Sequence, residues 1–536
     1  SLLSLLKLEG LATGLNGGGS SDTPDYGSAG IRIQLTDKGV LEYQNVLEYF
    51  FSYVEMLRKE GYKEYLFYEQ QTLAKLEEVY SDKGEGTWKA VSFANNLAFY
   101  PMEIAHRVDY HFGSPNYTAY DKILSYFRPN NMLCVLSDSN QDTPFEEFWY
   151  KSKYNYEEIV GDPYDKLLSV KPIDKMHLPK PNPYLPKSAK LISSTSKTEG
   201  YPELLEDSNG LKLYYGKDFE FQRPKASYLY KIYFPKSFTD LHSQTLMTLY
   251  VEAVNESMNE SSYPAKLAGM NFNLSSDPEG ISIIVNGYSD SIDELLREIL
   301  LNMNNISIPE SQFIALRNKM IRDWRNISRG DATGIARESI RKIIRRHYFD
   351  SLEMAEESKD IELSDIKNFS KDLLVKGFIE GMVYGNVSKE QARQNTKLFS
   401  KILNIMPDTW DQVAHQGRLD FNLGEDINQV VRSTVNNSCL WRLQFFGENN
   451  IEDAAQAAVI GAYIGSPFFI EMRTNQQLGY IVWGGASSYN KSSNLYFIIQ
   501  SGNHSADYLA NQAEKFALTL PDSLRELSDE EFSAIK

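Results

Sequence analysis

The chain has 536 residues and a formal net charge of −17 at pH 7, with 42% apolar and 12% aromatic residues. This length exceeds a single hydrophobic core, so we expect about three domains. The composition is typical of a folded globular protein and excludes a largely disordered one. The acidic charge argues against a general nucleic-acid binder, because neutralising phosphates requires a basic surface.

The first part of the chain is predicted to fold as helices with two separate strands. Apolar residues at helical spacing indicate the helices, and alternation of apolar and polar residues indicates the strands. The helices are expected within 1–15, from Lys38 to Gly61, from there to Tyr80, and at Met102–Tyr110 and Tyr120–Phe127, and the strands at Ile31–Leu35 and Met132–Leu136. The glycine-rich run Gly17–Gly19 is expected as a flexible loop. This arrangement favours an α+β layer, in which helices cover one face of a sheet.

A proline-rich stretch follows. Five prolines within KPIDKMHLPKPNPYLPKSAKL predict an extended connector that cannot form a helix. The elements expected after it are strands at Leu211–Tyr215, Ser227–Phe234, Gly280–Tyr288 and Leu374–Asn386, and helices at Phe238–Asn259, Ile292–Met303, Pro309–Ile327 and Thr333–Tyr348. Ser289 or Asp290 can cap the helix that starts at Ile292.

The helix-to-strand ending at Leu374–Asn386 echoes the one around residues 121–136, which predicts two copies of one α+β unit. A strand at Ser438–Phe446 and a helix at Glu452–Ile464 begin a further unit that stops at Lys536 in mid-pattern. The longest apolar stretch, Ala454–Ile464, is too short to span a membrane.

The segment SPFFIEMRTNQQLGYIVW, Ser466–Trp483, is the main candidate for chemistry. Phe469 and Arg473 are four residues apart and share one helix face, and Tyr480 opens a strand. A guanidinium and a phenol that converge on one carbonyl can stabilise negative charge on its oxygen. The alternative is that Arg473 is a solvated helix charge and Tyr480 a half-buried strand residue.

Other catalytic patterns are missing from the sequence. A zinc peptidase motif of the form H-E-x-x-H or H-x-x-E-H does not occur, and Glu103, His106 and His111 have the wrong spacing for one helix face. No G-x-S-x-G or P-loop occurs, and Cys134 and Cys439 lie in apolar runs that predict buried free thiols. We therefore expect no metal ligands in this chain.

A basic stripe interrupts this acidic protein. Arg337, Arg341 and Arg345 share one helical face, and Lys342, Arg346 and His347 lie beside them. A solvated helix face is one interpretation. The alternative is a positive wall that attracts acidic peptide segments or an acidic partner surface.

The segment RTNQQLGYIVWGGASSY, followed by NLYFIIQS, is similar to the R-T-x-x-Q-L-G-Y-x-V region of the insulinase/pitrilysin family of inverted-motif zinc peptidases. FRPNNMLCVLSDS, LPKPNPYLP and LKLYYGKDFEFQRPKASYLYKIYFP also resemble segments of that family, and Tyr384-Gly-Asn-Val387 stands where it often has His-Gly-Asn-Ile. The resemblance covers almost the whole chain.

In that family four homologous α+β domains form two halves around a chamber, and the first domain carries H-x-x-E-H and a distal Glu. The resemblance implies repeated α+β domains, each a mainly antiparallel sheet covered by helices on one face. Residues 1–160 correspond to part of the second domain, 161–212 to the proline-rich linker, 213–412 to the non-catalytic third domain and 413–536 to part of the fourth. The zinc site then lies upstream in a longer parent, on a partner chain, or is absent from this protein.

The resemblance also implies roles for single residues. Phe469, Arg473 and Tyr480 match family positions that contact substrate, with Arg473 and Tyr480 supporting the scissile carbonyl, and the strand near Ile31–Leu35 resembles the region that pairs with a substrate's N-terminal segment. The implied function is the substrate-binding C-terminal portion of a zinc metalloendopeptidase that degrades peptides in a chamber. Such a portion is inactive without the zinc-bearing N-terminal half, and it binds no metal itself. The alternative is a non-catalytic scaffold or binding subunit homologous to the peptidase.

Overall fold

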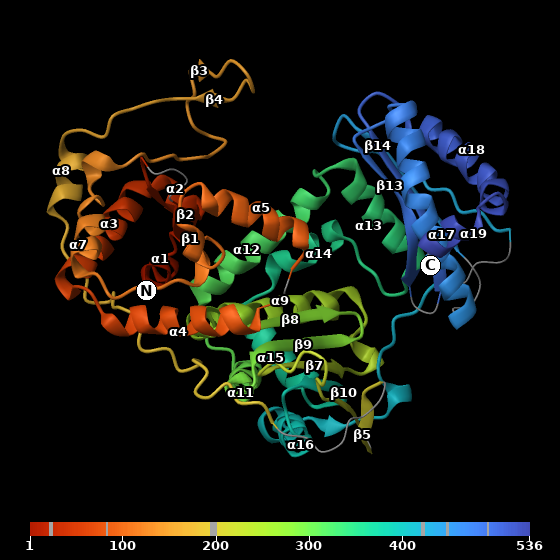
Figure 1. Ribbon diagram of the computed structural model, residues 1–536, viewed down its shortest axis with the longest axis horizontal. Helices are drawn as coiled ribbons and strands as arrows, with labels where there is room; N and C mark the ends of the chain where they lie inside the picture. Colours follow the sequence, from red (N-terminus) through yellow and green to blue (C-terminus); the bar gives the residue numbers. More distant parts are fainter. Residues whose placement is uncertain are drawn as a thin grey trace.

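The computed structural model describes residues 1–20, 25–81, 84–192, 201–208, 210–419, 424–445, 450–489 and 492–535. We refer to residues 1–177 as the N-terminal unit, 178–192 as the connector, 201–419 as the central unit and 424–535 as the C-terminal unit. The three larger clusters of buried apolar side chains belong mainly to one unit each. The colours of Figure 1 follow this order, from the N-terminal unit in red and orange to the C-terminal unit in blue.

The N-terminal unit holds a β-hairpin and surrounding helices. Its elements are α1 Leu2–Leu8, β1 Ala12–Ser20, β2 Ser28–Leu35, α2 Asp37–Leu41, α3 Tyr43–Glu60, α4 Glu64–Tyr80, α5 Gly86–Leu97, α6 Met102–Ala105, η1 Val108–Tyr110, α7 Tyr117–Ser125, η2 Pro129–Asn131, β3 Phe145–Glu146, β4 Lys153–Tyr154 and α8 Asp162–Ser169. β1 pairs with β2 and β3 with β4, both antiparallel. Leu6 of α1 and Val46 of α3 belong to the small core beside the hairpin.

Three expectations for this unit are wrong. The run Gly17–Gly19 is part of β1 and pairs with β2, because ladder hydrogen bonds need no side chains. Met132–Leu136 forms no strand, and Leu133 and Val135 are 80% and 81% exposed. The equivalent predicted strand of the central unit, at Leu374–Asn386, forms because it pairs with a strand on each side, whereas no described strand flanks Met132–Leu136. Cys134, within this segment, is therefore exposed rather than buried.

The central unit is built on a seven-stranded sheet of order β5-β6-β10-β7-β9-β8, with β11 beside β10. Most pairs are antiparallel, and β10 runs parallel to β6 and β11. Its elements are β5 Glu203–Ser208, β6 Leu211–Gly216, β7 Lys225–Tyr233, η3 Lys236–Phe238, α9 Leu241–Ser257, α10 Asn259–Leu267, β8 Asn271–Asp277, β9 Gly280–Tyr288, α11 Ile292–Asn304, α12 Glu310–Ile327, α13 Ala332–Ile344, α14 Ser351–Glu357, η4 Ser358–Asp360, α15 Leu363–Leu373, β10 Lys376–Gly385, α16 Lys389–Leu398, η5 Phe399–Leu403, β11 Met406–Pro407 and η6 Trp410–Gln412. Buried and half-buried residues alternate along β7, so one of its faces packs into the largest core, which also holds buried side chains of α9 and α11.

The connector crosses from the N-terminal unit to the central unit without helix or strand. The Asp290 carboxylate accepts hydrogen bonds from the backbone amides of Ser188 and Ala189 at 2.8 and 3.1 Å. The side-chain oxygen of Asn386 accepts a hydrogen bond from the Ile192 backbone amide at 2.7 Å, and its side-chain nitrogen donates one to the Lys190 carbonyl at 2.8 Å. Polar side chains at the ends of central strands therefore hold the connector. The wider range 161–212 also contains α8 and β5.

The C-terminal unit is a three-stranded antiparallel sheet of order β12-β14-β13. Its elements are β12 Ser438–Phe445, α17 Ile451–Phe469, η7 Ile470–Asn475, β13 Ile481–Tyr489, β14 Ser492–Ser501, α18 Ala506–Arg525 and α19 Asp529–Ile535. α17 and α18 share one core with β13 and β14. Within it the ring of Phe468 meets those of Phe497 and Phe516 edge-on, with centroids 5.1 Å apart in both pairs. Such contacts add about 0.5–1.5 kcal/mol beyond burial.

The central and C-terminal units repeat one pattern of strand, helix, antiparallel hairpin and helix. The pattern is β7, α9, β8–β9 and α11 in the central unit, and β12, α17, β13–β14 and α18 in the C-terminal unit. In both, the second hairpin strand pairs with the opening strand, so the first hairpin strand lies at the edge. The central and C-terminal units thus form an internal α+β repeat. The repeat predicted between residues 121–136 and Leu374–Asn386 is wrong in its first copy, because Met132–Leu136 forms no strand.

Helix α13 links the two units. It follows α12 in the central unit and packs against β12 of the C-terminal unit. It lies on the side of that sheet away from α18 (Figure 1). Among the described helices, none combines the length and apolar character needed to cross a bilayer.

Candidate functional site

Phe469, Arg473 and Tyr480 meet at the C-terminal end of α17. α17 ends at Phe469, and the chain continues as a π-helical stretch, η7. Such widened turns re-aim side chains at the end of a helix. The Arg473 guanidinium carbon lies 5.0 Å from the centroid of the Phe469 ring, so the two side chains share a face as the sequence predicts.

Arg473 contacts two aromatic rings. Its guanidinium carbon is 4.4 Å from the centroid of the Tyr480 ring, on which it stacks, in addition to its contact with Phe469. Its Nη1 donates a hydrogen bond of 2.8 Å to the backbone carbonyl of Tyr480. Cation–π contact with both rings and this bond fix the guanidinium in place, and further N–H donors remain on it.

The turn between η7 and β13 sets the position of Tyr480. Gln477 adopts a left-handed conformation with φ of 54°, and the buried Leu478 donates its amide to the Met472 carbonyl at 2.9 Å. A Cβ on Gly479 would lie 1.9 Å from the carbonyl oxygen of Gln500 on β14. Glycine is therefore required for the turn to lie directly against β14, which places Tyr480 at the end of the sheet.

The site is open and carries positive charge. Tyr480 is 80% exposed and Phe469 38% exposed. The nearby Glu471 carboxylate accepts hydrogen bonds from the side chains of Gln476 and Asn475, and these bonds lower the pKa of Glu471. No ion pair of Arg473 occurs among the described residues. A guanidinium and a phenolic hydroxyl on a free surface can both donate to one carbonyl or carboxylate oxygen.

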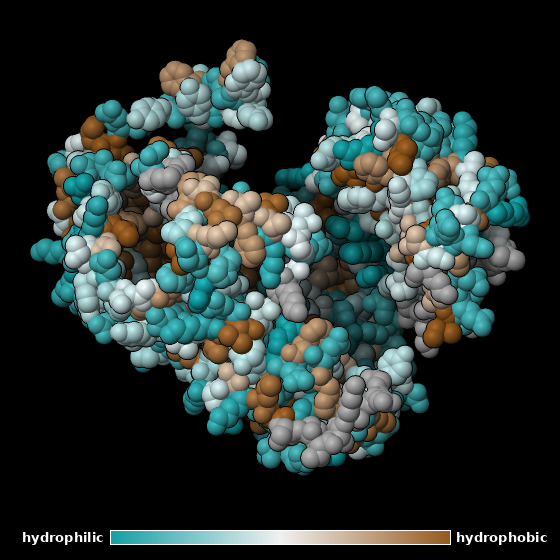
Figure 2. All heavy atoms as spheres, viewed as in Figure 1, coloured by the Kyte–Doolittle hydropathy of each residue, from teal (hydrophilic) through white to brown (hydrophobic). Residues whose placement is uncertain are grey.

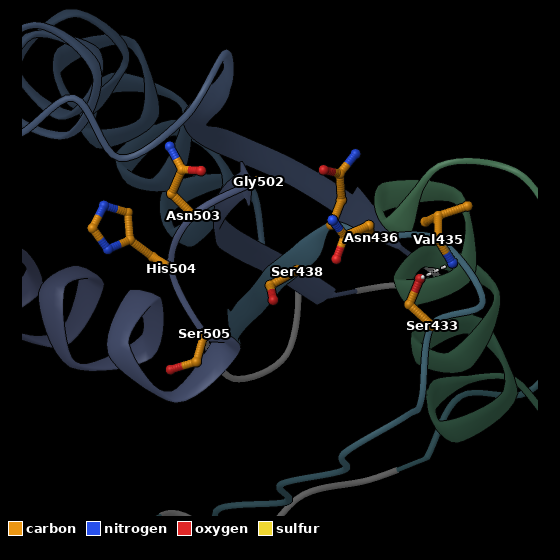
Figure 3. A pocket seen from close by; sticks show the side chains of 9 residues that line it. Ser433, Val435, Asn436, Ser438, Gly502, Asn503, His504 and Ser505 are labelled. Atoms are coloured by element: carbon orange, nitrogen blue, oxygen red, sulfur yellow. Dashed lines mark hydrogen bonds between the residues drawn. The ribbon is translucent and has the colours of Figure 1, made fainter.

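A polar pocket of about 380 Å³ lies at the same end of the sheet, where β12 begins and β14 ends. Figure 3 shows Asn503 and His504 on one side of it and Asn436 on the other. The Ser501 hydroxyl accepts the backbone amides of Asn503 and His504 at 3.2 and 3.1 Å, which shapes the β14–α18 turn. β14 lies between β12 and β13, so this pocket is separated from Tyr480 by one strand.

The remaining candidates do not form a metal or thiol site. Within the described ranges, no group of three or more His, Cys, Asp and Glu side chains is arranged to hold a metal ion, so these residues do not fit zinc. Cys439 is half-buried, and burial raises its pKa to about 11, which keeps the thiol protonated near neutral pH. Arg337 and Arg341 lie on α13, apart from Arg473, whereas Arg345 follows the end of that helix in an extended conformation, so the three arginines do not share one helix face as predicted.

Several residues that shape the site were not identified from the sequence. The π-helical stretch carries no sequence signal that separates it from an ordinary helix end. The role of Gly479 depends on Gln500, which is distant in sequence. The polar pocket is signalled only by the turn-forming runs Asn436-Asn437-Ser438 and Gly502-Asn503-His504-Ser505, which are common in loops.

Comparison with known proteins decides the family. The family described as "Middle or third domain of peptidase_M16" matches residues 79–357, more than half of the chain. The chain belongs to the insulinase/pitrilysin family. A second insulinase/pitrilysin family domain, "PQQ synthase PqqF-like, C-terminal lobe domain 4", matches residues 459–536, which include the Arg473 and Tyr480 positions.

Individual insulinase/pitrilysin relatives agree. Insulin-degrading enzyme from Bos taurus is 27% identical over 99% of this chain and 53% of its own length. Putative zinc protease mug138 from Schizosaccharomyces pombe is 25% identical over 100% of this chain and 56% of its own length. The crystal structure of pitrilysin superposes with a TM-score of 0.69 at 21% identity, covering 100% of this chain and 57% of that one, which shows a shared α+β fold. The chain spans about half the length of these relatives.

Proposed function

We propose that this chain is the substrate-binding portion of an insulinase-like zinc metalloendopeptidase, and that Arg473 and Tyr480 hold the substrate carbonyl next to the bond that is cleaved. The observation that carries the proposal is the fixed, exposed pair itself. The Arg473 guanidinium is stacked 4.4 Å from the Tyr480 ring centroid, and the Tyr480 side chain is 80% exposed. Donors fixed before substrate arrives stabilise developing charge on a carbonyl oxygen without reorganisation.

Each residue of the site has a separate part in this proposal. Arg473 supplies positive charge and N–H donors, and Tyr480 supplies an O–H donor. Phe469 also contacts the guanidinium and offers an apolar surface to the substrate. Zinc belongs to the half of the enzyme outside the described residues, which offer no ligand set for it. The chain alone is expected to bind peptides weakly and to hydrolyse almost none.

The first experiment separates the two halves of the activity. Peptide hydrolysis is measured with this chain alone, with a zinc-bearing N-terminal half, and with both together. We expect turnover only in the combined sample. Robust hydrolysis by the chain alone would falsify this division of labour.

The second experiment addresses the residues. In the combined enzyme, Arg473→Ala and Tyr480→Phe should each lower kcat/KM by roughly 10–1000-fold, the range for loss of an oxyanion donor. Tyr480→Phe keeps the ring on which Arg473 stacks, so the fall in kcat/KM of this variant reports on the hydroxyl alone. Tyr508→Phe, at an aromatic residue on α18, is the matched control and should leave turnover unchanged. Near-normal turnover in both site variants would show that the pair is structural.

The alternative is a non-catalytic scaffold or binding subunit homologous to the peptidase. Such a subunit needs no metal ligands, and the described residues contain no metal-ligand group. The Arg473–Tyr480 pair favours the peptidase, since a scaffold has no use for an exposed carbonyl-binding pair. The coding sequence upstream separates the two: H-x-x-E-H followed by a distal Glu supports the peptidase, and its absence supports the scaffold.

A further inference from the structure

The N-terminal unit follows the element order of the central unit except for one strand. In the central unit, the opening strand β7 is followed by α9, the hairpin β8–β9 and a series of helices from α11 to α15. The N-terminal unit has α1, the hairpin β1–β2 and a series from α3 to α7, with the short α2 in addition. The lengths agree as well, since α4 and α12 have 17 and 18 residues, and α5 and α13 have 12 and 13. No described strand of the N-terminal unit corresponds to β7.

β7 lies between β9 and β10 in the central sheet and is antiparallel to both. The counterpart of β9 is β2, which pairs with β1 alone among the described strands. The counterpart of β10 is Met132–Leu136, which follows α7 as β10 follows α15. The N-terminal unit therefore has the two neighbours of such a strand without the strand itself.

The segment Met132–Leu136 has the composition of a strand that is covered on both faces. It is an unbroken apolar run, which is typical of strands buried on both sides. Leu133, Cys134 and Val135 are nevertheless exposed. No backbone hydrogen bond joins this segment to another part of the described chain. Its sequence therefore suits a sheet, and it lacks a neighbour whose backbone pairs with it.

β2 gives the same indication from the other side. Ile281 and Ile283 of β9 are fully buried, whereas Ile31 of β2 is 41% exposed and no residue of β2 is buried. β9 has a strand on each side, and β2 has one on a single side of the described sheet. A strand at the free edge of β2 would give it the two neighbours that β9 has.

Helix α5 lacks the cover that its counterpart has. α13 packs against β12, in the sheet of the neighbouring unit. In α5 no residue is buried, and Val91, Phe93 and Leu97 are exposed. Figure 2 shows hydrophobic side chains gathered over this helix, which Figure 1 labels. Contiguous exposed apolar side chains of this kind mark a contact with another polypeptide.

We propose that an extended segment of the zinc-bearing N-terminal half enters the sheet between β2 and Met132–Leu136, and that the same half covers the apolar side chains of α5. The resulting order is Met132–Leu136, incoming strand, β2 and β1, as in β10-β7-β9-β8. β7 has nine residues, and its buried residues alternate, so we expect an incoming strand of similar length with apolar residues at alternate positions. The outer edge of β1 stays free for a substrate segment.

The described chain and its relatives favour this occupant. The chain covers 53% of insulin-degrading enzyme from Bos taurus and 57% of pitrilysin, so these relatives contain enough further polypeptide to supply both a strand and a cover for α5. A second copy of this chain could pair its Met132–Leu136 with the same segment here, but it would not provide a neighbour for β2. The inference rests on the proposed function, which assigns zinc to the N-terminal half.

The test is hydrogen exchange, read by mass spectrometry, of the full chain alone and mixed with the zinc-bearing N-terminal half. In the free chain the amides of Met132–Leu136 should exchange rapidly, because they have no backbone partner. In the mixture they should exchange at least about tenfold more slowly, together with the β2 amides that do not bond to β1. Maleimide modification of Cys134 should slow as well, with Cys439 as the internal reference.

Variants locate the contact. Leu133→Asp and Val135→Asp change side chains that are exposed in the free chain, so its thermal unfolding should stay the same. Each should weaken association with the N-terminal half by about tenfold or more, because a carboxylate without a partner would be buried in the completed sheet. Val430→Asp is the matched control, since Val430 is equally exposed but lies in the C-terminal unit, and it should leave association unchanged. Association is measured by analytical ultracentrifugation.

Several outcomes would overturn the inference. One is unchanged exchange at Met132–Leu136 in a mixture that hydrolyses peptides, which would leave the proposed function standing. Protection that rises with the concentration of the chain alone would assign the position to a second copy, and protection by a peptide substrate alone would assign it to the substrate. Equal effects of Val135→Asp and Val430→Asp would also exclude the contact. Arg473→Ala should abolish hydrolysis and leave the protection intact, so protection in a mixture without turnover would overturn the proposed function alone.

Discussion

Replacing Gly461 and Gly465 by alanine, one at a time, should change the stability of the C-terminal unit in opposite directions. Both glycines lie on α17, the helix that carries the Arg473 site. A Cβ on Gly461 would lie 2.4 Å from the backbone nitrogen of Ala486 on β13, whereas a Cβ on Gly465 would meet its nearest atom, the Gly484 oxygen, at 3.6 Å. The first contact is a collision with a strand backbone, and the second is ordinary van der Waals contact.

The two magnitudes follow from the same geometry. Alanine in a helix interior is about 0.5–1 kcal/mol more favourable than glycine, and Gly465→Ala should gain that amount because nothing opposes it. Gly461→Ala gains the same propensity but forces α17 away from β13, and overpacking of this kind costs about 1–3 kcal/mol. The free energies of unfolding of the two variants should therefore differ by about 1–3 kcal/mol, with Gly461→Ala the less stable.

Hydrogen exchange of the α17 and β13 amides, read by mass spectrometry, reports on this unit without unfolding the others. We expect faster exchange in Gly461→Ala and equal or slower exchange in Gly465→Ala, with shifts of the same sign in thermal unfolding. Since α17 positions Arg473, the Gly461 variant should also lose peptide hydrolysis in the combined enzyme. A Gly461→Ala protein as protected as Gly465→Ala would refute the close approach of helix and strand.

Three further predictions concern other parts of the chain. Gly479→Ala should displace the turn before β13, because its Cβ would lie 1.9 Å from a β14 carbonyl, and should lower hydrolysis in the combined enzyme as Tyr480→Phe does; unchanged turnover would contradict the geometry. Burial raises the pKa of Asp290, but hydrogen bonds from connector amides outweigh burial and hold the pKa below 3.8. The stabilisation of the connector by Asp290 is therefore complete above that pH and is lost as pH falls through the lower pKa of the folded protein. Asp290→Asn should flatten the acid dependence of hydrogen exchange at the Ser188 amide, and an unchanged pH profile would exclude the contact. Maleimide should modify the exposed Cys134 before Cys439, whose pKa burial raises to about 11, and peptide mass spectrometry would reveal the opposite order.

Much of the fold could be predicted because its elements carry their own local signal. Gly280–Tyr288 alternates along its length and is β9 with the same bounds, and the apolar spacing before Ile327 gives α12. The strand expected at Met132–Leu136 has the same local signal and does not form. Alternation measures how well a segment suits a sheet, but a strand also needs a neighbour whose backbone can pair with it.

For single side chains too, contacts set by local geometry could be predicted, whereas contacts with distant segments could not. Arg473 and Tyr480 could be placed together because a helix end and an adjoining strand bring them close through local geometry. Asp290 suits a helix cap by residue type, yet Ser291 takes the cap position of α11 and Asp290 binds the connector. Its two amide partners are about a hundred residues earlier in the chain, and no local pattern indicates them. The predicted boundaries at 160, 212 and 412 also depend on such distant contacts and stay predictions.

The Arg473 site differs from an ordinary surface arginine in how little freedom it has left. A long side chain on a surface loses about 2 kcal/mol of rotamer entropy when a ligand orders it. Arg473 has already lost most of that freedom, since two rings and the Tyr480 carbonyl fix it in the free chain. Any interaction it makes with a substrate oxygen is therefore offset by little further ordering. Because the same carbonyl belongs to the residue that carries the phenol, movement of the turn would move both donors together, and their spacing would persist as the enzyme closes on a peptide.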